Sequence, residues 1–142
     1  MSEAAEIIQS PCNSADLSAQ AIIELNDCYH PLNFEARLHR IYTDFRPEKI
    51  MVTSSFAATS AYFLHIISHI RPEQIIFFIN TGFHFPETLM YRDYLIKLYH
   101  LKVEDLKADD YQHQYSKKEK LYVTDPDFCC TINKVNPLEA IK

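Results

Sequence analysis

Two adjacent cysteines, Cys129 and Cys130, are the residues of this 142-residue sequence best suited to chemistry. On a helix, successive side chains diverge by about 100°, so two neighbouring thiolates reach one small ion poorly. An iron–sulfur cluster presents separate iron corners to adjacent cysteines, and it normally takes four thiolates. The pair also fits two small buried thiols or, with Lys134 nearby in the sequence, an activated catalytic thiol. The residues by themselves leave these three interpretations open.

Neither the other cysteines nor the histidines complete a metal site of recognisable spacing. Cys12 lies near the N-terminus without a Cys-x-x-Cys partner, and Cys28 falls on the predicted core face of a helix. His65 and His69 are four residues apart, a spacing that suits a metal on a helix. Because no third ligand accompanies them, we interpret these histidines as part of a polar helix face.

Two further segments carry groups that suit an anion. The segment "TSSFAATS" (53–60) supplies hydroxyls and backbone amides ahead of a predicted helix, whose N-terminus favours phosphate or sulfate. The segment "NTGFHFPE" (80–87) contains the only glycine of the chain, Gly82, together with His84 and Glu87. If both segments leave the carboxyl ends of parallel strands, they meet in one nucleotide pocket. The alternative is that the Ser and Thr side chains only cap the helix.

The elements that would position these groups follow from the hydrophobic pattern. Helical spacing predicts helices over 16–30, 33–45 and 60–70 and another that starts at Pro86, with Asn33 as an N-cap. Short apolar runs predict strands within 48–56, at 75–80 and at 101–106. The polar stretch 108–120 is predicted to be a mobile loop or an exposed helix.

The order of these elements indicates an α/β fold. After two helices the pattern β-α-β-α-β predicts a parallel sheet of three or more strands with flanking helices. Strand 75–80 is continuously apolar, which predicts cover on both faces of the sheet. We expect residues 1–15 to be loose and residues 16–142 to form a single α/β domain.

Charge and composition narrow the classes of partner. The formal net charge is −5 and the one tight basic cluster, Lys117, Lys118 and Lys120, lies in a polar stretch, so no nucleic-acid partner is expected. The longest apolar runs are about half a membrane span in length. The acidic start lacks the basic-then-apolar order of a secretion signal. We therefore expect a cytoplasmic protein, without membrane insertion, whose cysteines are thiols or metal ligands.

Four segments in this order resemble the adenylyl-sulfate and phosphoadenylyl-sulfate reductases of sulfate assimilation, which belong to the PP-loop, adenine nucleotide alpha hydrolase-like superfamily. The segments are "SSFAATS", "IIFFINTGFHFPET", "RDYLIKLY" and "DPDFCCTINKVNPLEAIK", and the resemblance covers about residues 49–142. The strand with its "TGFHFPET" exit, joined to the cysteine pair and "KVNPL", is specific. The hydroxyl loop alone would be weak evidence.

The resemblance implies a reaction and a set of site residues. In the family a cysteine near the C-terminus attacks the sulfur of the sulfonucleotide, and thioredoxin then releases sulfite. The branch with adjacent cysteines holds a [4Fe-4S] cluster, for which Cys129 and Cys130 match two of the four ligands, and Lys134 matches the lysine beside it. This branch favours adenylyl sulfate over phosphoadenylyl sulfate. The matching substrate-binding residues are Ser54, Ser55, Phe56, Thr59, Ser60, Thr81, Gly82 and Lys134.

The sequence also departs from the family pattern. It contains neither the Cys-x-x-Cys pair that completes the cluster nor the Cys-Gly-x-His nucleophile. Ala57 stands where a loop glycine is common, Asn80 where an aspartate is common, and Asn133 where an arginine usually precedes the lysine. We therefore expect a truncated, N-terminal portion of a reductase that is inactive as this chain alone. The alternative is a non-catalytic nucleotide-binding or interaction module of the same fold, and a homo-oligomer stays open.

Overall fold

The computed structural model describes residues 18–142, which fall into two compact units. Residues 18–50 belong to the first unit, and Met51–Lys142 form the second. The segment 1–15, expected to be loose, lies outside the described residues, and the single domain expected over 16–142 stays a prediction.

The first unit contains two helices, α1 (Ala19–Tyr29) and α2 (Phe34–Asp44), and a 3-10 turn at Pro47–Lys49. As predicted, Asn33 caps α2, because its side chain accepts a hydrogen bond from the backbone N–H of Ala36. Leu38 is the one buried residue of α2, and α1 has none. The prediction that Cys28 packs in a core is therefore wrong, since the side chain is exposed.

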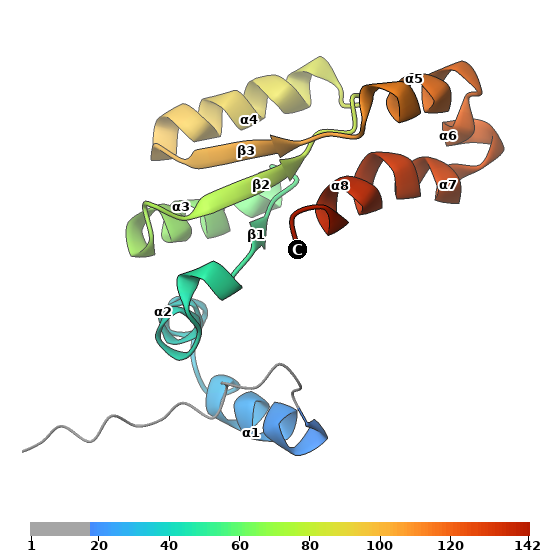
Figure 1. Ribbon diagram of the computed structural model, residues 1–142. Coiled ribbons are helices and arrows are strands. Elements are labelled where there is room, and N and C mark those ends of the chain that lie inside the picture. Colours follow the sequence, from blue (N-terminus) through green and yellow to red (C-terminus); the bar gives the residue numbers. More distant parts are fainter. Residues whose placement is uncertain (1–17) are drawn as a thin grey trace, which may run out of the picture. The chain divides into compact units, whose positions relative to one another are not determined.

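The second unit is built on a parallel sheet with strand order β1-β2-β3 (Figure 1). The strands are β1 (Val52–Thr53), β2 (Ile75–Ile79) and β3 (Lys102–Leu106). Val52 pairs with Ile76, and β2 pairs with β3 along its whole length. The crossover helices are α3 (Ala61–Ile70) and α4 (Pro86–Tyr99), the second of which starts at the predicted proline. The α/β fold with a parallel sheet is thus confirmed.

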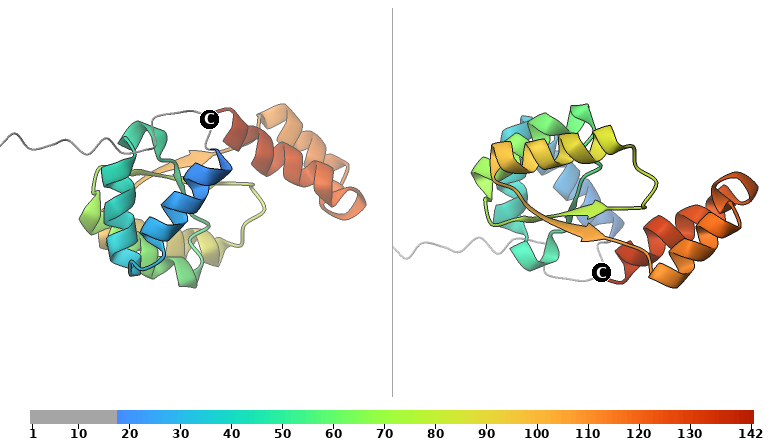
Figure 2. Two further views of the ribbon diagram at one scale, coloured as in Figure 1. Left: turned by 90° about the horizontal axis from the view of Figure 1, so that it is seen from below. Right: turned by 90° about the horizontal axis from the view of Figure 1, so that it is seen from above.

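The core of the second unit lies between the sheet and these two helices, which lie side by side on one face of it (Figure 2). Ile76 and Phe78 of β2 have no exposed surface. Leu64 and Ile67 of α3 and Leu95 of α4 are equally buried and belong to the same core. The other face of β2 is less covered, and Ile75 is 37% exposed. The cover of both faces expected from the apolar run is therefore incomplete in the part of the chain that is described, because both crossover helices lie on the same side.

The chain after β3 is helical to its end. It forms α5 (Asp110–Lys118), α6 (Leu121–Thr124), α7 (Pro126–Cys130), a π-helical turn (Thr131–Val135) and α8 (Asn136–Glu139). The segment predicted as a mobile loop or exposed helix is thus α5, which Asp109 caps by accepting from two backbone N–H groups. Within residues 18–142 no helix has both the length and the apolar character needed to cross a membrane.

Candidate functional site

The two predicted ligand loops leave the same edge of the sheet. β1 and β2 are parallel neighbours, so the loops that follow them begin side by side. The Ser54 N–H donates to the Phe77 carbonyl at 3.1 Å, and the Asn80 N–H donates to the Leu106 carbonyl at 2.8 Å. These bonds continue the β ladder into the start of each loop. The sequence prediction that both loops lie at the carboxyl ends of parallel strands is confirmed.

The first loop is held by a buried aromatic residue. Phe56 is 1% exposed and packs edge-on against Phe78, with 5.7 Å between ring centroids. Its φ of 55° is left-handed, and its N–H donates to the Ser54 hydroxyl oxygen at 3.0 Å. The next residue, Ala57, has a φ of −63°, so the backbone does not require glycine there.

The hydroxyls of the first loop do not act as helix caps. Ser60 precedes α3 without a side-chain capping bond, and the 3-10 turn Ala58–Ser60 has no side-chain cap either. Ser55 and Thr59 are exposed, and Ser60 is half-buried. The capping alternative is therefore not supported by the structure. The loop instead offers hydroxyls and a helix start at the open edge of the sheet.

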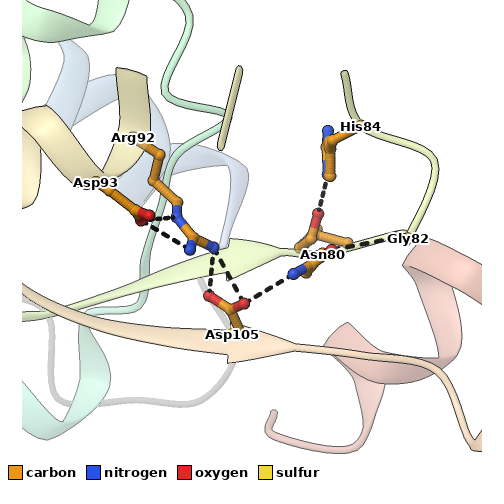
Figure 3. Close-up of polar contacts among 7 residues, drawn as sticks. Asn80, Gly82, His84, Arg92, Asp93 and Asp105 are labelled. Carbon is orange, nitrogen blue, oxygen red and sulfur yellow. Dashed lines mark hydrogen bonds and ion pairs between the residues drawn. The ribbon is translucent and has the colours of Figure 1, made fainter. Parts of the chain in front are cut away.

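The second loop is tied to the ends of β2 and β3 (Figure 3). The Asn80 side chain accepts from the Gly82 N–H at 3.2 Å and donates to the Asp105 carboxylate at 2.8 Å. Arg92 of α4 donates to both Asp105 oxygens, at 2.9 and 3.1 Å. His84 Nε2 lies 3.0 Å from the Ile79 carbonyl and donates to it. His84, a candidate from sequence, thus makes an internal contact that shapes the loop.

Arg92 also sets the charge at this edge of the sheet. Burial alone would lower the pKa of Arg92, but the hydrogen bond with Asp93 and the charges of Asp105 and Asp93 outweigh it, so the pKa is raised. The guanidinium carbon lies 4.8 Å from the centre of the Phe78 ring. The permanent positive charge of Arg92 therefore offsets the Asp105 carboxylate beneath the second loop.

A pocket of about 220 Å³ brings the second loop together with the cysteine pair. Its lining includes Thr81 from the loop and Cys129, Cys130 and Lys134 from the C-terminal helical segment. Cys129 is 8% exposed, whereas Cys130 is exposed. The remaining lining residues are Phe83, Tyr122, Pro126 and Asn133. Four of the site residues predicted from sequence thus share one pocket, while those of the first loop do not line it.

Gly82 is required by the packing at one side of this pocket. Its φ is 71°, and a Cβ there would lie 2.7 Å from Cε1 and Nε2 of His113. The His113 ring also contacts the ring of Phe83, with 5.4 Å between centroids. The only glycine of the chain therefore allows α5 to approach the second loop closely.

A buried asparagine joins α5 to the cysteine pair. Asn133 is 2% exposed, and its Nδ2 donates to the Cys129 carbonyl at 3.0 Å and to the Ser116 hydroxyl oxygen at 3.1 Å. The same nitrogen lies 3.6 Å from Cys129 Sγ, and His113 Nδ1 lies 2.8 Å from Asn133 Oδ1. In the sequence, Asn133 stands out only as a departure from a family pattern. Its spacing of four residues from Cys129 on a helix was the signal that could have revealed the contact.

The donor set at this pocket is incomplete for a four-iron cluster. Cys129 and Cys130 are two thiols that line one pocket, but a [4Fe-4S] cluster takes four. Residues 18–142 contain no group of three or more His, Cys, Asp or Glu side chains placed to hold a metal. This part of the chain therefore fits half of such a ligand set.

Comparisons with known proteins agree with this architecture. Residues 49–142 match the family model described as the phosphoadenosine phosphosulfate reductase domain. An adenosine 5'-phosphosulfate reductase of Chelativorans sp. (strain BNC1) is 35% identical over 125 residues, which are 82% of this chain and 49% of that protein. A phosphoadenosine 5'-phosphosulfate reductase of Gloeobacter violaceus is 34% identical over 64% of this chain and 39% of its own length.

One solved structure shares the fold. The crystal structure of phosphoadenylyl-sulfate (PAPS) reductase from Candida auris, a phosphate complex, superposes with a TM-score of 0.73 and 25% sequence identity. The match covers 89% of this chain and 63% of that one. The chain thus spans about half, or less, of the length of these two curated relatives.

Proposed function

Because the chain belongs to the phosphoadenosine phosphosulfate reductase family, we propose that it forms the sulfonucleotide-binding part of a reductase that converts adenylyl sulfate to sulfite. The observation that carries the proposal is the pocket that joins Thr81 of the second loop to Cys129, Cys130 and Lys134. It opens where parallel α/β sheets bind ligands, beyond the carboxyl ends of the strands. Phosphoadenylyl sulfate is the less favoured substrate.

The first loop is proposed to hold the phosphate. Ser54, Ser55, Thr59 and Ser60 provide hydroxyls, and the left-handed backbone of Phe56 is a conformation that also occurs in anion-binding turns. The start of α3 adds the partial positive charge of a helix N-terminus.

The second loop and Lys134 are proposed to hold the sulfate end of the substrate. The Thr81 hydroxyl oxygen accepts from the Phe83 N–H at 3.3 Å, which leaves the hydroxyl hydrogen for a ligand. Gly82 lets this loop approach α5. Lys134 is exposed in the pocket and supplies a positive charge for an anion.

Cys129 and Cys130 are proposed as two ligands of a [4Fe-4S] cluster. When bound, the cluster would supply positive charge beside the sulfate. We further propose thioredoxin as the reductant and a cytoplasmic location, whose reducing conditions keep these cysteines from forming disulfides.

A second candidate is a nucleotide-binding module without catalysis. It is favoured by the donor set of residues 18–142, in which two thiols line the pocket and no group of three or more possible metal ligands is present. The two candidates share the ligand site and differ in whether sulfite is released. Since this chain alone lacks the Cys-Gly-x-His nucleophile, the distinguishing assay adds thioredoxin, adenylyl sulfate and the C-terminal remainder of a homologous reductase to the reduced chain. Release of sulfite supports the reductase, and binding without sulfite supports the module.

Titration calorimetry of the reduced chain with adenylyl sulfate, AMP and ATP tests the ligand site. We expect adenylyl sulfate to bind more tightly than AMP, because it alone of these two presents a sulfate to Lys134. Lys134→Ala should weaken adenylyl sulfate about five- to tenfold and leave AMP nearly unchanged. The matched control is Lys118→Ala in the last turn of α5, which removes a lysine outside the pocket lining. Equal affinities for adenylyl sulfate and AMP, unaffected by Lys134→Ala, would contradict the proposal.

A further inference from the structure

We propose that His113 and Asn133 form a hydrogen-bonded relay that positions the Cys129 thiol and makes the two adjacent cysteines chemically different. The functional meaning of the relay rests on the proposed sulfonucleotide site, to which Cys129 contributes. The relay itself rests on side chains of α5 and of the C-terminal helical segment. Asn133 and Ser116 are the two buried polar residues of the described chain, and they contact each other.

The hydrogen positions in the relay follow from one fixed donor. The Ser116 hydroxyl donates to the His113 carbonyl at 2.8 Å, so its lone pairs must accept from Asn133 at 3.1 Å. The Cys129 carbonyl can only accept, and it lies 3.0 Å from the same nitrogen. The amide nitrogen of Asn133 therefore faces Cys129 and its oxygen faces His113. Since that oxygen is an acceptor, Nδ1 of His113 must carry the hydrogen of the 2.8 Å bond.

The two cysteines differ as a result. Cys129 is 8% exposed, and its sulfur lies 3.6 Å from the amide nitrogen of Asn133, within reach of an N–H to sulfur hydrogen bond. Cys130 is exposed, and in the described part of the chain no hydrogen bond reaches its sulfur. The two hydrogens of the Asn133 amide go to the Cys129 carbonyl and the Ser116 hydroxyl oxygen, so the sulfur of Cys129 can only share one of them. The sulfur of Cys129 is thus packed against this amide, whereas that of Cys130 is exposed.

The relay also connects the cysteine pair to the second loop. The His113 ring lies against Gly82, closely enough that a Cβ at that position would meet it at 2.7 Å. Its Nδ1 edge orients Asn133, and its Nε2 edge faces the loop. His113 and Asn133 are therefore positioning residues, which set where the sulfur of Cys129 lies relative to Thr81 in the pocket.

Thiol reaction rates test this relay without any nucleotide. In a background with Cys12→Ser and Cys28→Ser, the variant Cys130→Ser reports on Cys129, and Cys129→Ser reports on Cys130. With the disulfide reagent DTNB at one fixed pH, Cys130 should react at least about tenfold faster than Cys129. Adding Asn133→Leu or His113→Leu should raise the rate of Cys129 about three- to tenfold.

A conservative variant separates positioning from simple packing. His113→Asn keeps an N–H donor near the position of Nδ1, so the rate of Cys129 should return to within about twofold of the parent rate. Circular dichroism checks that each variant is folded. If Asn133→Leu does not fold, the comparison of His113→Leu with His113→Asn decides.

Two results would overturn the relay. One is that Cys129 and Cys130 react equally fast in the parent background. The other is that His113→Leu and His113→Asn change the rate of Cys129 equally. The DTNB reaction needs no nucleotide, so the two proposals can fail separately. If the thiol rates are as expected but adenylyl sulfate does not bind, only the proposed function is refuted. If adenylyl sulfate binds but either of the two results above is found, only the relay is refuted.

Discussion

At the scale of single residues, left-handed backbone marks both ligand loops. Phe56 and Gly82 have φ values of 55° and 71°. Phe56 gains the burial of a whole aromatic ring in this conformation, which offsets the backbone cost. Gly82 has no such compensation, and it lies where a side chain would strike His113. The first loop therefore adopts its left-handed residue by burying a large side chain, and the second by having no side chain at that position.

Gly82→Ala should destabilise the chain by roughly 1–3 kcal/mol, measured by urea denaturation. The added methyl is strained by the positive φ and meets a histidine ring that cannot move without losing its bond to Asn133. In the double variant Gly82→Ala, His113→Ala the steric part should disappear, so the further loss over His113→Ala alone should be smaller. An equal loss from Gly82→Ala in both backgrounds would show that the ring is not the obstacle.

Residue types indicated much of the site, but not its inner contacts. The sequence identified Thr81, Cys129, Cys130 and Lys134, and the structure brings them into one pocket. The contact of His113 with Asn133 was missed, because it spans twenty residues and depends on how α5 packs on the π-helical turn. The left-handed backbone of Phe56 was not predicted either, since the sequence singled out only its neighbour Ala57, as a residue where a loop glycine is common.

At the scale of elements, one carboxylate links the ends of β2 and β3 to the middle of α4. Asp105 accepts from Arg92 of α4 and from Asn80, which follows β2. An aspartate at position 80, the residue common in the family, would place a second carboxylate against the first. An amide satisfies both neighbours, because its nitrogen donates to Asp105 and its oxygen accepts from Gly82.

Asn80→Asp should lower the free energy of unfolding by about 1–2 kcal/mol at neutral pH, because it replaces a donor to Asp105 with a second carboxylate. Asn80→Ala is the matched control, which removes the hydrogen bonds without adding charge and should cost about 1 kcal/mol. The excess cost of Asn80→Asp should shrink in mildly acidic buffer, as the introduced carboxylate takes up a proton. Urea denaturation at both pH values measures this. A cost that does not depend on pH would mean that Arg92 compensates both carboxylates.

Element types were easier to predict than element faces. Periodicity identified α1 to α4 but not the helices that follow β3, and the apolar runs identified β1, β2 and β3. Helical spacing puts Tyr91, Tyr94, Leu95 and Leu98 on one face of α4, yet of these four Leu95 alone is buried, and Tyr94 is 58% exposed. A face can be predicted only when the neighbour that covers it is known, and a sequence pattern does not supply the neighbour.

At the scale of the whole molecule, the second unit carries the pocket and both ligand loops. Met51–Lys142 form this unit, and the family match over 49–142 coincides with it almost completely. The chain spans 49% and 39% of the two curated relatives, so the activity of a complete reductase remains a proposal for this protein. The function proposed for this unit is to bind the nucleotide.

The most direct test of the account is a heteronuclear NMR titration of the reduced chain with adenylyl sulfate, which reports binding residue by residue. The account predicts that the largest amide shifts fall in 54–60, in Thr81 and Gly82, and in 129–134. The amides around His65, His69 and His100, which line a separate surface pocket, serve as the internal control and should not move. Shifts confined to that second pocket, or no shifts at saturating ligand, would contradict the claim that the strand ends and the cysteine pair form one nucleotide site.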